Sequence, residues 1–184
     1  MPVSPNAQTA KWRVVTPPTS LPVTSFAVET HLRLQPSTEP QTYIDLLVQA
    51  ATDFAEESMA TSLMPRTLCA TFYGREPIVL PRGPIISIAS IVDAGQTAVS
   101  NYTLQNVGRT TRVVPAAAVD YPVSVMYEAG YVAGRIPPSI KLAILAHVAT
   151  LYEHRESVGE KAMAAIPHSL QAFYRLHSRK VGIA

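Results

Sequence analysis

The chain has 184 residues, of which 47% are hydrophobic and only 15% are charged, and its formal net charge is +2. So weak a charge is unlike the dense basic field of proteins that grip nucleic acid by its phosphates, and the single Cys69 excludes an internal disulfide and a zinc site built from cysteines. The length predicts one domain with appended arms, and the apolar excess favours additional surface buried between subunits.

Neither export nor a membrane span is expected from the sequence. The first residues lack the basic and apolar regions of a signal peptide, and the longest apolar run contains Lys141 and His147. We therefore expect a protein that is made in the cytoplasm and has no membrane partner.

Residues 1–22 predict an extended N-terminal arm, because they are crowded with proline, threonine and serine. Within the arm only residues 11–15 have strand character, and Trp12 is the apolar side chain able to anchor it on a partner. The folded domain is expected over residues 23–178, and a short C-terminal tail over residues 179–184.

Two helices are expected before the strands. Thr24 or Ser25 can cap the first, over residues 24–34, and a loop with two prolines separates it from the second, over residues 41–61. The second helix carries apolar side chains at intervals of three and four residues: Tyr43, Leu46, Leu47, Ala50, Phe54 and Ala55. Glu56 and Glu57 near its end could form a carboxylate pair, but a solvated helix face is the better interpretation.

Residues 67–128 predict a small, largely antiparallel sheet. A strand before Gly74 turns into residues 78–80, weaker strands follow at 102–105 and 112–114, and a clear one covers 123–127. Between them, alternation places Ile86, Ile88, Ser90 and Val92 on one face of a strand. With helices on both sides of this segment, the fold class is α+β, a helical bundle with an inserted sheet.

A central helix is predicted over residues 137–157 and a terminal helix over 168–178. The central helix has two apolar stripes, one through Ile140, Ile144, Val148 and Leu151, the other through Leu142, Leu145, Ala149 and Tyr152. A helix that is apolar on two sides must be covered on two sides. We expect its own domain to cover the first stripe and a neighbouring copy of the chain to cover the second.

Catalytic motifs are absent from the sequence: it has no nucleophile elbow, phosphate-binding loop or zinc-protease signature. His147 and His154 lie seven residues apart on one helix and, with Glu156, could in principle hold a metal in a small metalloprotein or enzyme. A buried polar His147 and a surface His154 are the better interpretation. The basic terminal residues Arg175, Arg179 and Lys180 could contact DNA phosphates weakly, or equally an acidic partner.

Several short motifs occur in an order typical of one family. They span about residues 22–175: Pro22-Val-Thr, His31-Leu-Arg-Leu, residues 44–56 with Ala50-Ala51, Leu80-Pro-Arg-Gly-Pro, Tyr121-Pro, Val125-Met-Tyr-Glu-Ala-Gly-Tyr131, Ile136-Pro-Pro, Leu151-Tyr-Glu-His-Arg-Glu156 and Ile166-Pro-His-Ser. In these motifs the chain resembles the head-to-tail connector proteins, also called adaptor or head-completion proteins, of long-tailed bacteriophages and gene-transfer particles.

The resemblance implies a structural virion protein that is not an enzyme and has no cofactor. Such proteins form a ring of about twelve copies beneath the portal, extend the DNA channel and dock the next neck or tail component. The implied partners are further copies of the chain, the portal protein, a downstream neck or tail-completion protein, and DNA that passes without sequence-specific binding. The implied location is the virion neck, between capsid portal and tail, after synthesis in the host cytoplasm. Candidate subunit or portal contacts are Trp12, Leu142, Leu145, Tyr152, Arg155, Arg175, Arg179 and Lys180.

Overall fold

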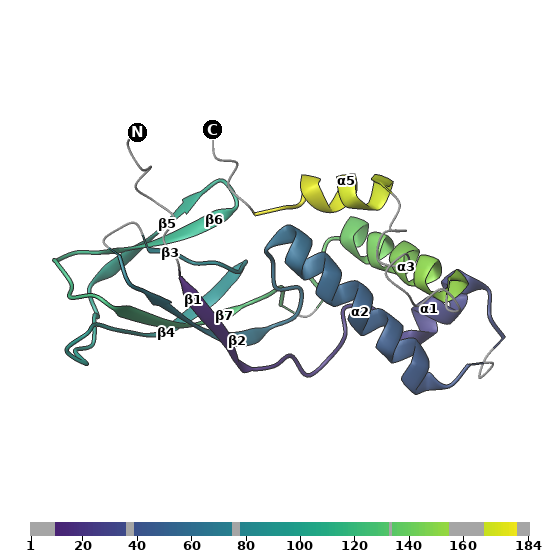
Figure 1. Cartoon of the computed structure of the whole chain (residues 1–184), viewed down its shortest axis with the longest axis horizontal. Coiled ribbons are helices and arrows are strands. Elements are labelled where there is room, and N and C mark those ends of the chain that lie inside the picture. Colours follow the sequence, from purple (N-terminus) through teal and green to yellow (C-terminus); the bar gives the residue numbers. More distant parts are fainter. Residues whose placement is uncertain (1–9, 36–38, 75–77, 133, 155–167, 180–184) are drawn as a thin grey trace. The chain divides into compact units, whose positions relative to one another are not determined.

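The chain divides into two units, each assembled from two separate stretches of sequence, in the computed structural model (Figure 1). The structure describes residues 10–35, 39–74, 78–132, 134–154 and 168–179. The strand unit comprises Met1–Pro17 and Pro65–Gly130, and the helix unit comprises Pro18–Met64 and Tyr131–Ala184. The expected α+β class is confirmed, although the strands form two antiparallel sheets where one was expected.

The first sheet of the strand unit has four antiparallel strands in the order β1-β2-β7-β4. These are β1 (Lys11–Thr16), β2 (Arg66–Phe72), β7 (Val123–Ala129) and β4 (Ile85–Val92). Part of the expected N-terminal arm is therefore an edge strand. Its alternation of basic and apolar residues suits a sheet edge, and its backbone groups pair with those of β2.

The second sheet has three antiparallel strands in the order β3-β6-β5. They are β3 (Ile78–Val79), β6 (Thr110–Pro115) and β5 (Tyr102–Val107). The sequence predicted that β2 turns directly into β3, but the two strands belong to different sheets, since β2 pairs with β7 and β3 pairs with β6. Alternation identifies strands but carries no information on which strand lies beside which.

The prediction that Ile86, Ile88, Ser90 and Val92 share one face of β4 is wrong. Ile85, Ile88 and Ile91 stand opposite Ala129, Tyr127 and Val125 of β7. The register shifts once between Ile85 and Ser87 and again between Ile88 and Ser90, and each extra residue moves the next isoleucine back to the inner face. A spacing of three in the sequence thus becomes a spacing of two along β7. The core of this unit consists of Leu68, Ala70, Phe72, Ile78, Leu80, Ile91, Val113, Val123, Val125, Tyr127 and Ala129.

Four helices are described in the helix unit: α1 (Ser25–Leu32), α2 (Gln41–Met59), α3 (Pro138–Glu153) and α5 (His168–Leu176). Thr24 caps α1 as predicted, because its Oγ1 accepts the Ala27 N–H at 3.2 Å. The central helix ends at Glu153, four residues before its predicted end; residues 155–157 lie outside the described part of the chain. None of these helices combines the length and apolar character needed to cross a membrane.

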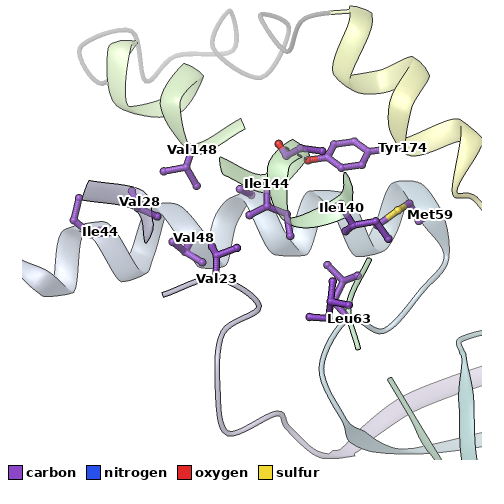
Figure 2. Packing of buried hydrophobic residues seen from close by; sticks show 14 residues of the cluster. Val23, Val28, Ile44, Val48, Met59, Leu63, Ile140, Ile144, Val148 and Tyr174 are labelled. Carbon is purple, nitrogen blue, oxygen red and sulfur yellow. Dashed lines mark hydrogen bonds between the residues drawn. The ribbon is translucent and has the colours of Figure 1, made fainter. Parts of the chain in front are cut away.

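The core of the helix unit lies between α1, α2, α3 and α5 (Figure 2). α2 contributes Ile44, Val48, Ala51, Ala55 and Met59, so its buried face is rotated from the predicted one, and Leu46 and Ala50 are exposed. α3 contributes Ile140, Ala143, Ile144 and Val148, which confirms the first predicted stripe except for the half-buried Leu151.

Glu56 is buried, which corrects the prediction that it lies on a solvated helix face. Its Oε1 accepts the Leu63 backbone N–H at 2.7 Å. Glu57, the next residue, is exposed. Because the chain turns back after α2, with Ala60 in the left-handed region at φ 51°, the carboxylate satisfies an N–H that would otherwise be buried without a partner.

Gly130 ends β7 in a backbone conformation that favours glycine. Its φ is 138°, and its N–H donates to the Pro84 carbonyl oxygen at 2.9 Å. Gly130→Ala should lower the free energy of unfolding by about 1–3 kcal/mol, because a Cβ strains this conformation. Gly74→Ala, where a Cβ would meet nothing within 4 Å, should change it by less than about 0.5 kcal/mol. Urea unfolding measures both, and equal effects would contradict the assignment of strain to Gly130.

Candidate assembly surfaces

Trp12, the predicted anchor of the N-terminal arm, lies in β1 opposite Ala70 of β2. Its side chain remains 40% exposed, and the guanidinium carbon of Arg82 lies 4.8 Å from the ring centroid. Arg82 itself is buried. This cation–π contact holds the indole at the sheet edge, where one side of the ring stays accessible.

The second stripe of α3 is only partly open. Leu142 is 59% exposed, whereas Leu145 is half-buried and packs against the helical core. Leu142 is therefore the residue of this stripe that a partner can contact most fully.

Tyr152 is satisfied within its own unit. Its hydroxyl donates to Glu39 Oε1 at 2.7 Å, and its ring centroid lies 6.5 Å from that of Tyr43. The side chain is half-buried by these contacts. Tyr152 thus joins the end of α3 to the start of α2, and only part of its surface is open to another molecule.

The basic C-terminal residues differ in their surroundings. Arg175 is exposed on α5, while the backbone N–H of the half-buried Arg179 donates to the Met59 carbonyl oxygen at 2.7 Å. The nearby Tyr174 is fully buried, and its hydroxyl donates to the Ala143 carbonyl oxygen at 3.4 Å. These contacts bind α5 and the following residues to α2 and α3, and they leave Arg175 as the accessible charge. Arg155 and Lys180 lie outside the described residues.

The two histidines of the alternative metal site are separated. His147 is 2% exposed and lies in an aromatic cluster, with its ring centroid 5.2 Å from Phe54 and 6.3 Å from Tyr174, while His154 is exposed at the end of α3. Seven residues of helix span about 10 Å, whereas two zinc ligands lie within about 4 Å of each other. Glu156 is outside the described residues, and the described ones contain no group of three potential metal ligands.

Burial lowers the pKa of His147 from 6.5 to about 4. Its Nδ1 has no hydrogen-bond partner in the part of the chain that the structure describes. The imidazole is therefore neutral at pH 7 and packs as an apolar ring. This agrees with the prediction that His147 is a buried residue and not a metal ligand.

Exposed apolar side chains also occur at positions that the sequence did not single out as contacts. The most exposed are Phe26, Leu46, Val132 and Leu176 in the helix unit, and Tyr73, Val107 and Leu104 in the strand unit. Leu46 was predicted in the core because α2 is apolar over more of its circumference than one buried face needs. For Leu104 the missing information was the strand order, because an edge strand leaves one flank of a core-side residue uncovered.

No protein-family model matches the chain, and no curated protein does. Solved structures that resemble it include chains of gene transfer agent particles. A chain from the virion of the native particle has a TM-score of 0.71 at 21% identity, covering 93% of this chain and 97% of that one. A chain from the neck of the empty particle, computed with C6 symmetry, has a TM-score of 0.73 at 20% identity, with coverage of 94% and 98%. One from the neck of the native particle, computed with C12 symmetry, has a TM-score of 0.68 at 21% identity, with coverage of 95% and 98%. At these identities the likeness shows a shared fold.

Proposed function

We propose that this chain is a structural protein of the neck of a phage-like particle and is not an enzyme. The observation that carries the proposal is the likeness to gene transfer agent chains, two of them from the neck, over more than nine-tenths of both chains.

The proposed assembly is a homo-oligomeric ring between portal and tail. Cyclic symmetry in the similar neck chains supports a ring, and exposed Leu142 offers an apolar contact for a second copy. The net charge of +2 supports a channel wall past which DNA slides, since a strongly basic wall would retain the phosphates. The portal and a downstream neck or tail component are the proposed axial partners, and the virion neck is the proposed location.

The test is reconstitution with the portal that belongs to the same particle. We expect electron microscopy to show a ring of this protein on the portal face that is directed to the tail, and native mass spectrometry to give a whole-number stoichiometry. A protein that binds neither the portal nor other copies of itself would contradict the proposal.

Attachment to the portal is also expected to depend on Arg175. Arg175→Glu reverses an exposed charge on α5 and should weaken attachment by up to about tenfold, most strongly at low salt, because exposed ion pairs are screened. Arg135→Glu reverses an exposed charge elsewhere in the same unit and is the matched control. Equal binding of both variants, measured against the unchanged protein over a salt series, would show that Arg175 does not face the portal.

A further inference from the structure

β5 is an edge strand that lacks the usual protection against pairing with another chain. Natural sheet edges are blunted by charged residues, prolines, bulges or very short strands. β5 reads Tyr-Thr-Leu-Gln-Asn-Val, with neither charge nor proline, and all six of its residues pair with β6 without a register shift. Its free side is therefore ready to accept a further strand.

The other described sheet edges differ in how far they are open. β3 has two residues, and the register of β4 shifts twice against β7, so neither presents a long regular edge. β1 has six residues, all exposed, and its irregularity lies at the C-terminal end, between Val14 and Thr16. β1 and β5 are thus the two longest regular edges of the described strand unit.

Leu104 shows that the inner face of the sheet is incomplete at β5. It stands opposite Val113 of β6, and because opposed residues share a face, both side chains point to the core side. Val113 is fully buried, yet Leu104 is 45% exposed. The difference arises because none of the described strands follows β5 in the sheet.

The same pattern occurs at β1. Val14 and Trp12 stand opposite the buried Leu68 and Ala70, so they also lie on the core side, and each remains 40% exposed. Lys11 and Arg13 alternate with them and lie on the other face. Both edges therefore end in apolar side chains that one more strand would cover.

We propose that β1 of one copy pairs with β5 of the next copy and joins the two sheets across the subunit interface. This inference rests on the proposed ring, because a closed ring requires two different surfaces that fit each other. Pairing of β5 with a second β5 would use one surface twice and stop at a dimer. β5 carries no charge that could repel Lys11 or Arg13, and Leu104 would extend the apolar surface of Val14 and Trp12.

Two substitutions block one edge each. Leu104→Lys places a charge on the core side of β5, and Val14→Lys does so on β1. Each variant alone should associate with itself at least about tenfold more weakly than the unchanged protein, as measured by sedimentation velocity over a concentration series. Thr103→Lys adds the same charge to the opposite face of β5 and should leave association unchanged. Urea unfolding of each variant confirms that the strand unit remains folded.

Mixing the two blocked variants tests the pairing itself. Leu104→Lys retains an intact β1, and Val14→Lys retains an intact β5. An equimolar mixture should therefore form heterodimers held by a single β1–β5 pairing, and no rings. Native mass spectrometry resolves them once one variant is isotope-labelled. A folded Leu104→Lys variant that assembles like the unchanged protein, or a mixture that remains monomeric, overturns the edge pairing while the proposed neck function stands. An unchanged protein that associates neither with itself nor with the portal overturns both.

Discussion

Replacing Ile144 with alanine is expected to lower the free energy of unfolding of the helix unit by about 2–5 kcal/mol. Ile144 is 0% exposed, lies in the middle of α3 and packs in the cluster shared by α1, α2 and α5 (Figure 2). Truncation removes buried methyl and methylene groups and leaves a cavity, because helices packed on several sides cannot collapse into it. Urea unfolding followed by circular dichroism measures the loss.

Leu142→Ala is the matched control, since it removes a similar number of carbon atoms from the same helix. Leu142 is largely exposed, so this change should alter the stability of the isolated subunit by less than about 0.5 kcal/mol. If a neighbouring copy covers Leu142, the same change weakens assembly without unfolding the subunit. Equal losses of stability from the two substitutions would contradict the observed burial of α3.

Acidification from pH 7 to pH 4.5 is expected to cost the helix unit roughly 2.5 kcal/mol through His147 alone. Burial lowers the folded-state pKa of this imidazole to about 4, whereas the unfolded chain has a pKa of 6.5. The unfolded state therefore binds the proton first. The stabilisation by neutral His147 is complete above pH 6.5 and is lost progressively as the pH falls toward 4.

His147→Leu isolates this contribution, because leucine fills much of the site and does not titrate. The variant should lose less stability than the unchanged protein between pH 7 and pH 4.5, by roughly the same 2.5 kcal/mol. The carboxylates titrate in both proteins, so their contributions to the pH dependence of stability cancel in the comparison. His154→Gln removes an exposed histidine and should leave the pH dependence unchanged. Parallel stability curves for the unchanged protein and His147→Leu would show that His147 is not buried in its neutral form.

Helix positions could be predicted from the sequence more closely than their buried faces. Thr24 and the prolines before α3 mark helix starts through local backbone chemistry, which acts within a few residues. The rotation of α2 depends on what packs against it. Leu46 and Ile44 are equally apolar, and only the positions of α1 and α3 decide that Ile44 is buried.

The pairing of the strands could not be predicted from the sequence as closely as the helices. The bulges of β4 arise because Ile85, Ile88 and Ile91 must all reach the core opposite β7, a demand that exists only once β7 is beside β4. The burial of Glu56 has a similar origin, because its acceptor role depends on the turn that brings back Leu63. Exposed Leu142 and buried His147 were within reach of the sequence, since one α3 face was expected to remain open and a structural His147 was favoured over a metal ligand.

The position of β1 has a consequence for the dynamics of the free subunit. Its pairing of Thr16 with Thr67 encloses 50 residues, including α1 and α2, and none of its six side chains is buried. Closing this loop costs conformational entropy. That cost is offset mainly by backbone hydrogen bonds and by the contact between Trp12 and Arg82. β1 should therefore detach in local openings that leave β2 and β7 paired, and its amide hydrogens should exchange with solvent faster than theirs. The free subunit should thus keep one strand in reversible exchange between bound and released states, at little cost to the rest of the fold.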